Sequence, residues 1–355
     1  MSTHETLIEI QDDGAAPASV AATGPRGGRW RSAWRLASSV LGVLMIVALA
    51  AFAWQRRDLL ADADVLSAPR LAICALATIL GWQFTSSLTS TLMLAHGCRL
   101  PLREQYLSIC AGNAGNYLPM RIGTICRAVY VKTCFGMPFA EFFSVMLAQA
   151  IVGGAVAAAV LLGAFAAGSR MAGDETGRTL AVAAVMTLSP VGLLLLPGLF
   201  DALRRNVRLP SLVSRVLASI VVLGRSPRTL LAASLWHFLS VVCAAVRLWM
   251  IYGAFGAPVS VWATIFVTAA GALSMLIAPT PGALGVREAS MAAAGAVFGV
   301  NFELSLLVAS LERAILLALT MLIGAPALVW MNREVASRVA GPLPSSTTVA
   351  IPEPN

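Results

Sequence analysis

The stretch FAEFFSVMLAQAIVGGAVAAAVLLGAFA, residues 139–166, decides the class of this protein. Glu141 is its only charged residue, and it is longer than the ~20 apolar residues with which a helix crosses the hydrocarbon core of a bilayer. Comparable apolar runs occupy residues 36–54, 71–96, 179–199, 229–252, 260–279 and 303–331. Repeated runs of this length predict an all-α, polytopic membrane helix bundle.

The composition excludes several other classes. Of 355 residues, 58% are hydrophobic and only 12% are charged, about half the charged fraction of ordinary soluble domains. A soluble enzyme, a disordered protein and a disulfide scaffold are therefore excluded. The net charge of +8 comes from arginines in the loops, which indicates membrane orientation and attraction to anionic lipids rather than nucleic-acid binding.

The basic residues are distributed unevenly between alternating loops. If residues 105–135 dip into the membrane and return while 284–300 cross it, the chain has about eight transmembrane helices. Its termini then lie on one side, which holds 17 of the 25 basic residues, while the other side holds five. Because cytoplasmic loops carry the excess of Lys and Arg, we expect both termini in the cytoplasm.

The chain divides into one membrane domain and two tails. Residues 1–30 are small and polar, and we expect a disordered cytoplasmic tail. Residues 31–331 form the transmembrane domain, and 332–355 are rich in Pro, Ser and Thr and predict a disordered C-terminal tail. A cleaved signal peptide ending near Ala50 is a competing interpretation of the first apolar run.

Two apolar segments are interrupted by helix-breaking residues. Residues 105–135 contain NYLPMRIGTICRA and residues 279–300 begin PTPGALGVREAS. Pro119, Pro279 and Pro281 break the helices, and Gly123 and Gly285 follow the breaks at equal spacing from Pro119 and Pro281. A Pro/Gly-interrupted segment in each half of the chain is typical of transporters built from inverted repeats, although this match is short.

Arginines lie beside both breaks. A helix that starts inside the protein presents unpaired N–H groups that favour an anion, and an arginine binds a phosphate with two parallel hydrogen bonds. Arg121, Arg127 and Arg287 therefore suggest a phosphate site, at which Glu288 would hold or release Arg287. The alternative is that the first two, with Lys132, are ordinary cytoplasmic anchors.

Two further groups of polar residues fall inside apolar runs. Glu312 and Arg313 lie far from either end of 303–331, and ionisable groups at membrane depth are usually functional. The partner of Arg313 is either Glu288 or Glu312. His237, Ser240, Ala244 and Arg247 fall on one stripe of a helix, with Arg247 close enough to the end of its run to reach the surface.

Motifs of known enzymes are absent. Three histidines make a His-rich metal site improbable, and neither a nucleophile elbow nor a nucleotide-binding loop occurs. We therefore expect neither an enzyme nor a resident cofactor.

The broken segments resemble the lysylphosphatidylglycerol synthase transmembrane-region family. Pro119-Met-Arg121-Ile-Gly123 followed by Arg127 is similar to the family pattern P-G-R-x-G-E-x-x-R. Residues 279–288, with Pro279, Pro281, Gly282, Gly285, Arg287 and Glu288, are similar to P-x-P-G-G-x-G-x-R-E. Arg313 matches an arginine of the last helix. Met120 and Thr124 depart from the first pattern, and Thr124 replaces its Glu.

The resemblance implies a flippase-like protein of the bacterial inner membrane, without the synthase domain. It would move a phospholipid or another amphiphilic lipid between leaflets, and its partners would be membrane lipids, anionic or phosphate-bearing. The residues expected to bind the lipid are Arg121, Gly123, Arg127, Gly282, Gly285, Arg287, Glu288 and Arg313. The alternative is a non-transporting accessory subunit that partners a lipid-biosynthetic enzyme of hopanoid, polyprenyl-lipid or phospholipid synthesis.

Overall fold

The computed structural model describes Ala51, Gln55, Val221 and residues 67–117, 122–168, 226–277 and 283–340. Every regular element within these ranges is a helix. The predicted all-α membrane bundle is therefore confirmed for the part of the chain that the structure describes. The predicted tail 1–30 and the apolar run 179–199 lie outside these ranges, and of the run 36–54 only Ala51 is described.

Four long helices form the frame of the molecule. They are α3 (Ala68–Leu94), α6 (Phe139–Gly168), α9 (Pro227–Ala254) and a continuous helix made of α12 (Phe302–Leu319), the π-helical turn η4 (Thr320–Gly324) and α13 (Ala325–Ala340). Each is long and apolar enough to cross a membrane. The last extends into the predicted C-terminal tail, so residues 332–340 are helical.

Four short helices form two hairpins at the Pro/Gly breaks. α4 (Leu102–Gly115) packs against α5 (Ile122–Phe135), and α10 (Val261–Ile277) packs against α11 (Val286–Val297). At 1.5 Å per residue, the 14 residues of α4 and the 12 of α11 span roughly 21 and 18 Å, less than the ~30 Å of the hydrocarbon core. The sequence leaves open whether residues 279–300 cross or re-enter, and α10 and α11 turn back on each other as a re-entrant segment does.

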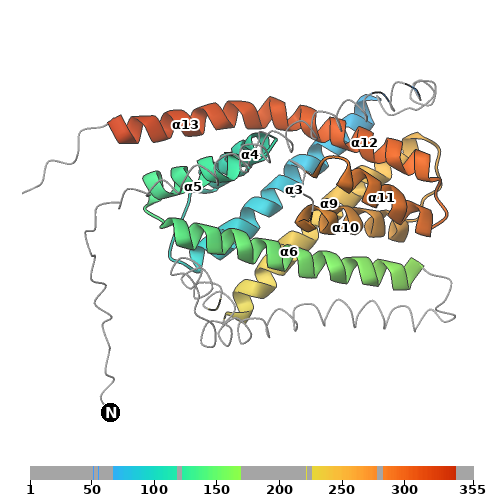
Figure 1. The fold of residues 1–355 in the computed structure, drawn as a ribbon, viewed down its shortest axis with the longest axis horizontal. Coiled ribbons are helices and arrows are strands. Elements are labelled where there is room, and N and C mark those ends of the chain that lie inside the picture. Colours follow the sequence, from blue (N-terminus) through green and yellow to red (C-terminus); the bar gives the residue numbers. More distant parts are fainter. Residues whose placement is uncertain are drawn as a thin grey trace, which may run out of the picture.

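The order of elements repeats. A long helix, a hairpin and a second long helix occur as α3, α4–α5, α6 and again as α9, α10–α11, α12–α13. The long helices α3 and α9 pack together, and each hairpin packs against the closing helix of the other half, α4 on α13 and α10 on α6. The hairpins lie at opposite ends of the bundle (Figure 1). This arrangement fits the inverted repeat that the sequence suggested.

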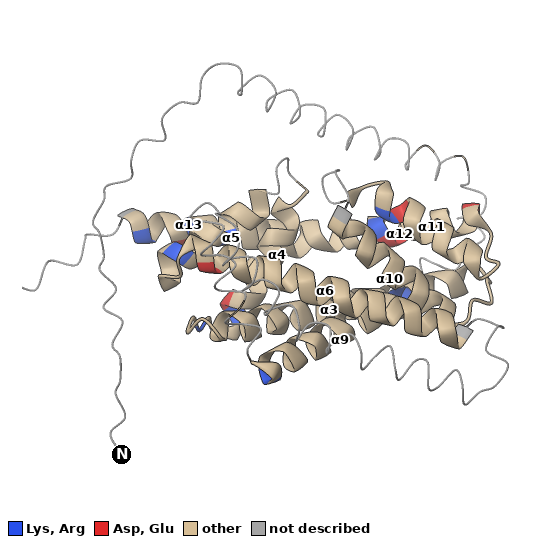
Figure 2. Ribbon diagram, turned by 60° about the horizontal axis from the view of Figure 1, so that its bottom comes forward, with Lys and Arg blue, Asp and Glu red and all other residues tan. Residues whose placement is uncertain are grey.

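Many charged residues of the described elements gather in two places (Figure 2). One group lies at the end of the bundle formed by α5 and α13, and the other lies inside the bundle at α11 and α12. Many large apolar side chains, such as Leu76, Leu231 and Leu322, are exposed on the outside. The described part of the molecule therefore has a largely apolar outside and a charged cluster inside, the reverse of a soluble protein.

Candidate functional site

The first break is closed by direct backbone contact between α4 and α5. A Cβ atom on Gly123 would lie 2.1 Å from the Gly112 carbonyl oxygen, and one on Gly115 would lie 2.4 Å from the Gly123 Cα. Only glycine permits this approach. The Asn116 Oδ1 accepts hydrogen bonds from the Thr124 backbone N–H and hydroxyl, both at 3.2 Å. Gly123 thus allows the two helices to pack closely. The Thr124 N–H, one of the groups expected to bind an anion, is instead bound by Asn116.

The second break has a similar internal cap. Gly285, the residue before α11, has a φ of +79°, in the left-handed region that favours glycine. Its N–H donates to Glu288 Oε2 at 2.7 Å. The carboxylate of Glu288 thereby stabilises the start of its own helix. At both breaks the helix start is bound by a side chain of the protein, so any ligand anion has to be bound mainly by the arginines.

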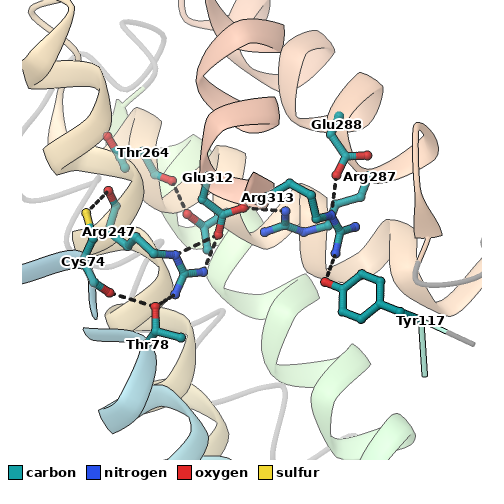
Figure 3. Close-up of polar contacts among 10 residues, drawn as sticks. Cys74, Thr78, Tyr117, Arg247, Thr264, Arg287, Glu288, Glu312 and Arg313 are labelled. Carbon is teal, nitrogen blue, oxygen red and sulfur yellow. Dashed lines mark hydrogen bonds and ion pairs between the residues drawn. The ribbon is translucent and has the colours of Figure 1, made fainter. Parts of the chain in front are cut away.

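Two ion pairs join α11 to α12 (Figure 3). Arg287 Nη1 lies 2.6 Å from Glu312 Oε2, and Arg313 Nε lies 2.8 Å from Glu288 Oε1. Both carboxylates are at most 1% exposed. The sequence left the partner of Arg313 open, and the structure assigns Glu288. The expectation that Glu288 pairs with its neighbour Arg287 is wrong, because adjacent residues on a helix point in different directions.

Arg247 extends this cluster to α9 and α3. Its guanidinium donates through Nε to Glu312 Oε1 at 2.9 Å, and a second bond links Nη2 to the same oxygen. Nη1 donates to the Thr78 hydroxyl at 3.1 Å. Arg247 is only 5% exposed, so it does not reach the surface as its place in the sequence suggested. It belongs to the site, and its helical spacing from His237 and Ser240 was the signal for it.

A cavity of about 320 Å³ opens beside these ion pairs. Arg247, Arg287 and Arg313 line it, whereas Glu288 and Glu312 do not. All four residues of the predicted stripe, His237, Ser240, Ala244 and Arg247, also line it. The remaining polar lining includes hydroxyl and amide groups of Thr78, Thr85, Asn113, Asn116, Thr268 and Thr320.

The described charges of this cluster do not cancel. Three guanidinium groups face two carboxylates, and arginine keeps its proton in proteins. The described residues of the cluster therefore carry one excess positive charge next to the cavity. Because a buried charge is costly unless it is paired, this excess makes the cavity a favourable place for one anion.

Arg127 is buried elsewhere. It lies on α5 at 7% exposure, with its guanidinium carbon 5.8 Å from the centre of the Phe142 ring and Nη1 3.8 Å from the Met146 sulfur. Within the described ranges, its Nε and Nη2 have no hydrogen-bond partner. Arg127 does not line the cavity of Arg287, so the structure does not bring these two predicted site residues together.

Several predicted site residues lie outside the described ranges. They are Pro119, Arg121, Pro279, Pro281 and Gly282. Gln149 Oε1 accepts a hydrogen bond from the Thr89 hydroxyl at 3.0 Å. In the described ranges, no cluster of three or more His, Cys, Asp or Glu side chains is arranged to hold a metal ion.

Comparison with known protein families identifies the family of this chain. No curated protein matches the chain. A family model described as "Lysylphosphatidylglycerol synthase TM region" matches residues 35–324, which include both hairpins and all five residues of the ion-pair cluster. The match covers most of the 355 residues and agrees with the resemblance of the two broken segments. The chain belongs to the lysylphosphatidylglycerol synthase TM region family of membrane proteins.

Proposed function

We propose that this protein is a lipid translocase that moves a phosphate-bearing lipid between the leaflets of the bacterial inner membrane. The observation that carries the proposal is the cavity with one excess positive charge, lined by Arg247, Arg287 and Arg313. A volume of about 320 Å³ is at the lower end of the range for ligand pockets. It suits a lipid headgroup, while the acyl chains stay in the bilayer.

The chemistry of the lining supports a phosphate ligand. Guanidinium groups bind phosphate oxygens through paired, charge-assisted hydrogen bonds. In a site shielded from water such bonds are stronger than at a surface. The ion pairs with Glu288 and Glu312 hold the three arginines in place before a ligand arrives, which lowers the entropy cost of binding.

The repeated architecture supports movement between two sides. Binding sites of secondary transporters lie where discontinuous helices of two inverted repeats meet. Here α11, from one break, contributes Arg287 to the cavity. From the other break, α4 contributes Asn113, and the residue that caps its C-terminus, Asn116, lines the same cavity. Rocking of one half against the other would expose the cavity to each leaflet in turn.

The distribution of charge supports the orientation with both termini in the cytoplasm. Replacing two crossings by the α10–α11 hairpin leaves six crossings and keeps every basic loop on the side first assigned to it. The side with 17 of the 25 basic residues is therefore still the one expected to face the cytoplasm.

The test is a translocation assay in proteoliposomes with a fluorescent phosphatidylglycerol whose outer-leaflet label is reduced chemically. Arg287→Lys keeps the charge but loses the forked geometry of the guanidinium, and we expect it to slow translocation at least tenfold. Arg338→Lys is the matched control, because the Arg338 side chain is 60% exposed. Equal rates in both variants, with both proteins monodisperse, would reject this site.

A different outcome would favour the second candidate function. If the natural-sequence protein translocates no lipid and copurifies with a fixed lipid-biosynthetic enzyme, then the accessory-subunit interpretation is correct. In that case the arginine cavity would bind lipid without transporting it.

A further inference from the structure

We propose that the cavity selects a lipid whose headgroup is a singly charged phosphodiester with free hydroxyl groups, and that it discriminates against headgroups with a primary amine. This inference rests on the proposed function and specifies its substrate. Three observations carry it: the charge balance, the occupation of both carboxylates, and neutral polar groups of the lining without partners.

The charge balance favours one negative charge. With three guanidinium groups and two carboxylates among the described residues of the cluster, a phosphodiester monoanion brings the site to neutrality. A doubly charged phosphomonoester would leave one negative charge uncompensated in a region of low dielectric. Such a charge is costly away from water.

Every oxygen of the two carboxylates accepts at least one hydrogen bond. Glu312 Oε1 accepts from Arg247 and Oε2 accepts from Arg287, while Glu288 Oε1 accepts from Arg313 and Oε2 accepts from the Gly285 N–H. Neither carboxylate lines the cavity. An ammonium group in the cavity would therefore meet the three guanidinium groups and find no acidic lining residue in the described part of the chain. Headgroups with an amine are disfavoured by repulsion and by the loss of their hydration.

Two neutral groups of the lining await a partner. Thr320 is 0% exposed, and its hydroxyl has no hydrogen-bond partner among the described residues. It begins the π-helical turn of η4, a distortion that often occurs at functional sites. The Nε2 of His237 also lacks a partner within the described ranges. Both line the cavity, and both are able to donate to or accept from a hydroxyl group.

Leaving a buried hydroxyl unsatisfied is unfavourable. A ligand hydroxyl would remove that cost at Thr320, whereas a headgroup without hydroxyls would not. The same lining thus binds the phosphate through arginines and the rest of the headgroup through neutral polar groups. Glycerol, sugar and inositol headgroups meet this description, and ethanolamine and aminoacylated headgroups do not.

Native mass spectrometry of the purified full chain tests this selectivity directly. The protein is incubated with equimolar phosphatidylglycerol, phosphatidylethanolamine and lysylphosphatidylglycerol of the same acyl chains. We expect at least tenfold higher occupancy by phosphatidylglycerol than by either amine-bearing lipid. Equal occupancy, or preference for an amine-bearing lipid, would overturn the inference and leave the translocase proposal standing.

A second variant tests the role of the hydroxyl group. Thr320→Val keeps the shape of the side chain and removes one hydrogen bond, so we expect about fivefold weaker binding of phosphatidylglycerol and unchanged binding of phosphatidylethanolamine. Thr91→Val is the matched control, because Thr91 bonds to the Ser87 carbonyl on α3 and does not line the cavity. A parallel loss for both lipids in Thr320→Val would contradict the inference. Selective binding of phosphatidylglycerol without translocation would support the headgroup inference and reject only the proposal that the protein is a translocase.

Discussion

Glu312 is the residue on which the ion-pair cluster depends most. Its carboxylate accepts from Arg247 and Arg287 on two different helices and is 1% exposed. Glu312→Gln keeps the shape of the side chain but replaces one accepting oxygen by a donating amide. One of the two arginines then loses its acceptor, and both lose the counter-charge.

The expected cost follows from this geometry. Removing one partner of a buried ion pair costs about 3–5 kcal/mol, and Gln still offers one oxygen, so we expect a loss of about 3 kcal/mol. The exposed pair of Arg338 and Glu334, with 3.3 Å between Nε and Oε1 and 60% and 36% side-chain exposure, provides the control. Glu334→Gln should cost no more than about 0.5 kcal/mol.

The measurement is the free energy of unfolding in mixed micelles titrated with a denaturing detergent, followed by tryptophan fluorescence. A third variant combines Glu312→Gln with Arg247→Met, which removes the charge that Glu312→Gln leaves unpaired. We expect this double variant to regain at least half of the lost stability. If Glu312→Gln costs no more than Glu334→Gln, or the double variant is less stable than the single one, the account of the cluster is wrong.

Three further predictions concern other parts of the site. Gly123→Ala should prevent folding, because the added Cβ would lie 2.1 Å from a carbonyl oxygen. The readout is the loss of monodisperse protein. The control is Gly253→Ala, whose added Cβ has nothing within 4 Å and should leave stability unchanged or raise it by up to about 1 kcal/mol. Arg127→Met should keep or raise the thermal unfolding temperature, because it removes a buried cation whose Nε and Nη2 have no hydrogen-bond partner in the described ranges. A lower unfolding temperature would assign Arg127 a structural role. Tyr117→Phe removes the hydroxyl that accepts a hydrogen bond from Arg313 at 3.3 Å. It should lower the free energy of unfolding in the detergent titration by about 1 kcal/mol. A loss above about 3 kcal/mol would contradict this and show that the hydroxyl holds the cluster together.

The long helices were predictable because hydropathy is a property of continuous sequence. The run 139–166 became α6, Phe139–Gly168, and the run 229–252 became α9, Pro227–Ala254. The breaks near Pro119 and Pro281 were also predictable, since proline and glycine act on the local backbone. The hairpin of α10 and α11 was not, because an apolar run of 17 residues is compatible with either crossing or turning back.

The charged site was predictable as a set of residues but not as a set of pairs. Arg287, Glu288, Glu312 and Arg313 stand out because ionisable groups are rare inside apolar runs. Which carboxylate meets which arginine depends on the rotation of α11 against α12, and sequence spacing does not give that rotation. The position of Arg247 near the end of an apolar run was compatible with the surface, and the sequence of one helix does not reveal that its partner Glu312 comes from another helix.

The excess positive charge of the cavity has an electrical consequence. A monoanionic lipid neutralises the site when bound, so the loaded protein moves no charge and the empty site carries one charge on its return. Each cycle that delivers such a lipid to the outer leaflet therefore moves one negative charge outward, along the inside-negative membrane potential. A potential of 100 mV contributes about 2.3 kcal/mol per charge, which corresponds to about a 50-fold enrichment of the lipid in the outer leaflet. Under the proposed function, the membrane voltage alone drives export of an anionic lipid.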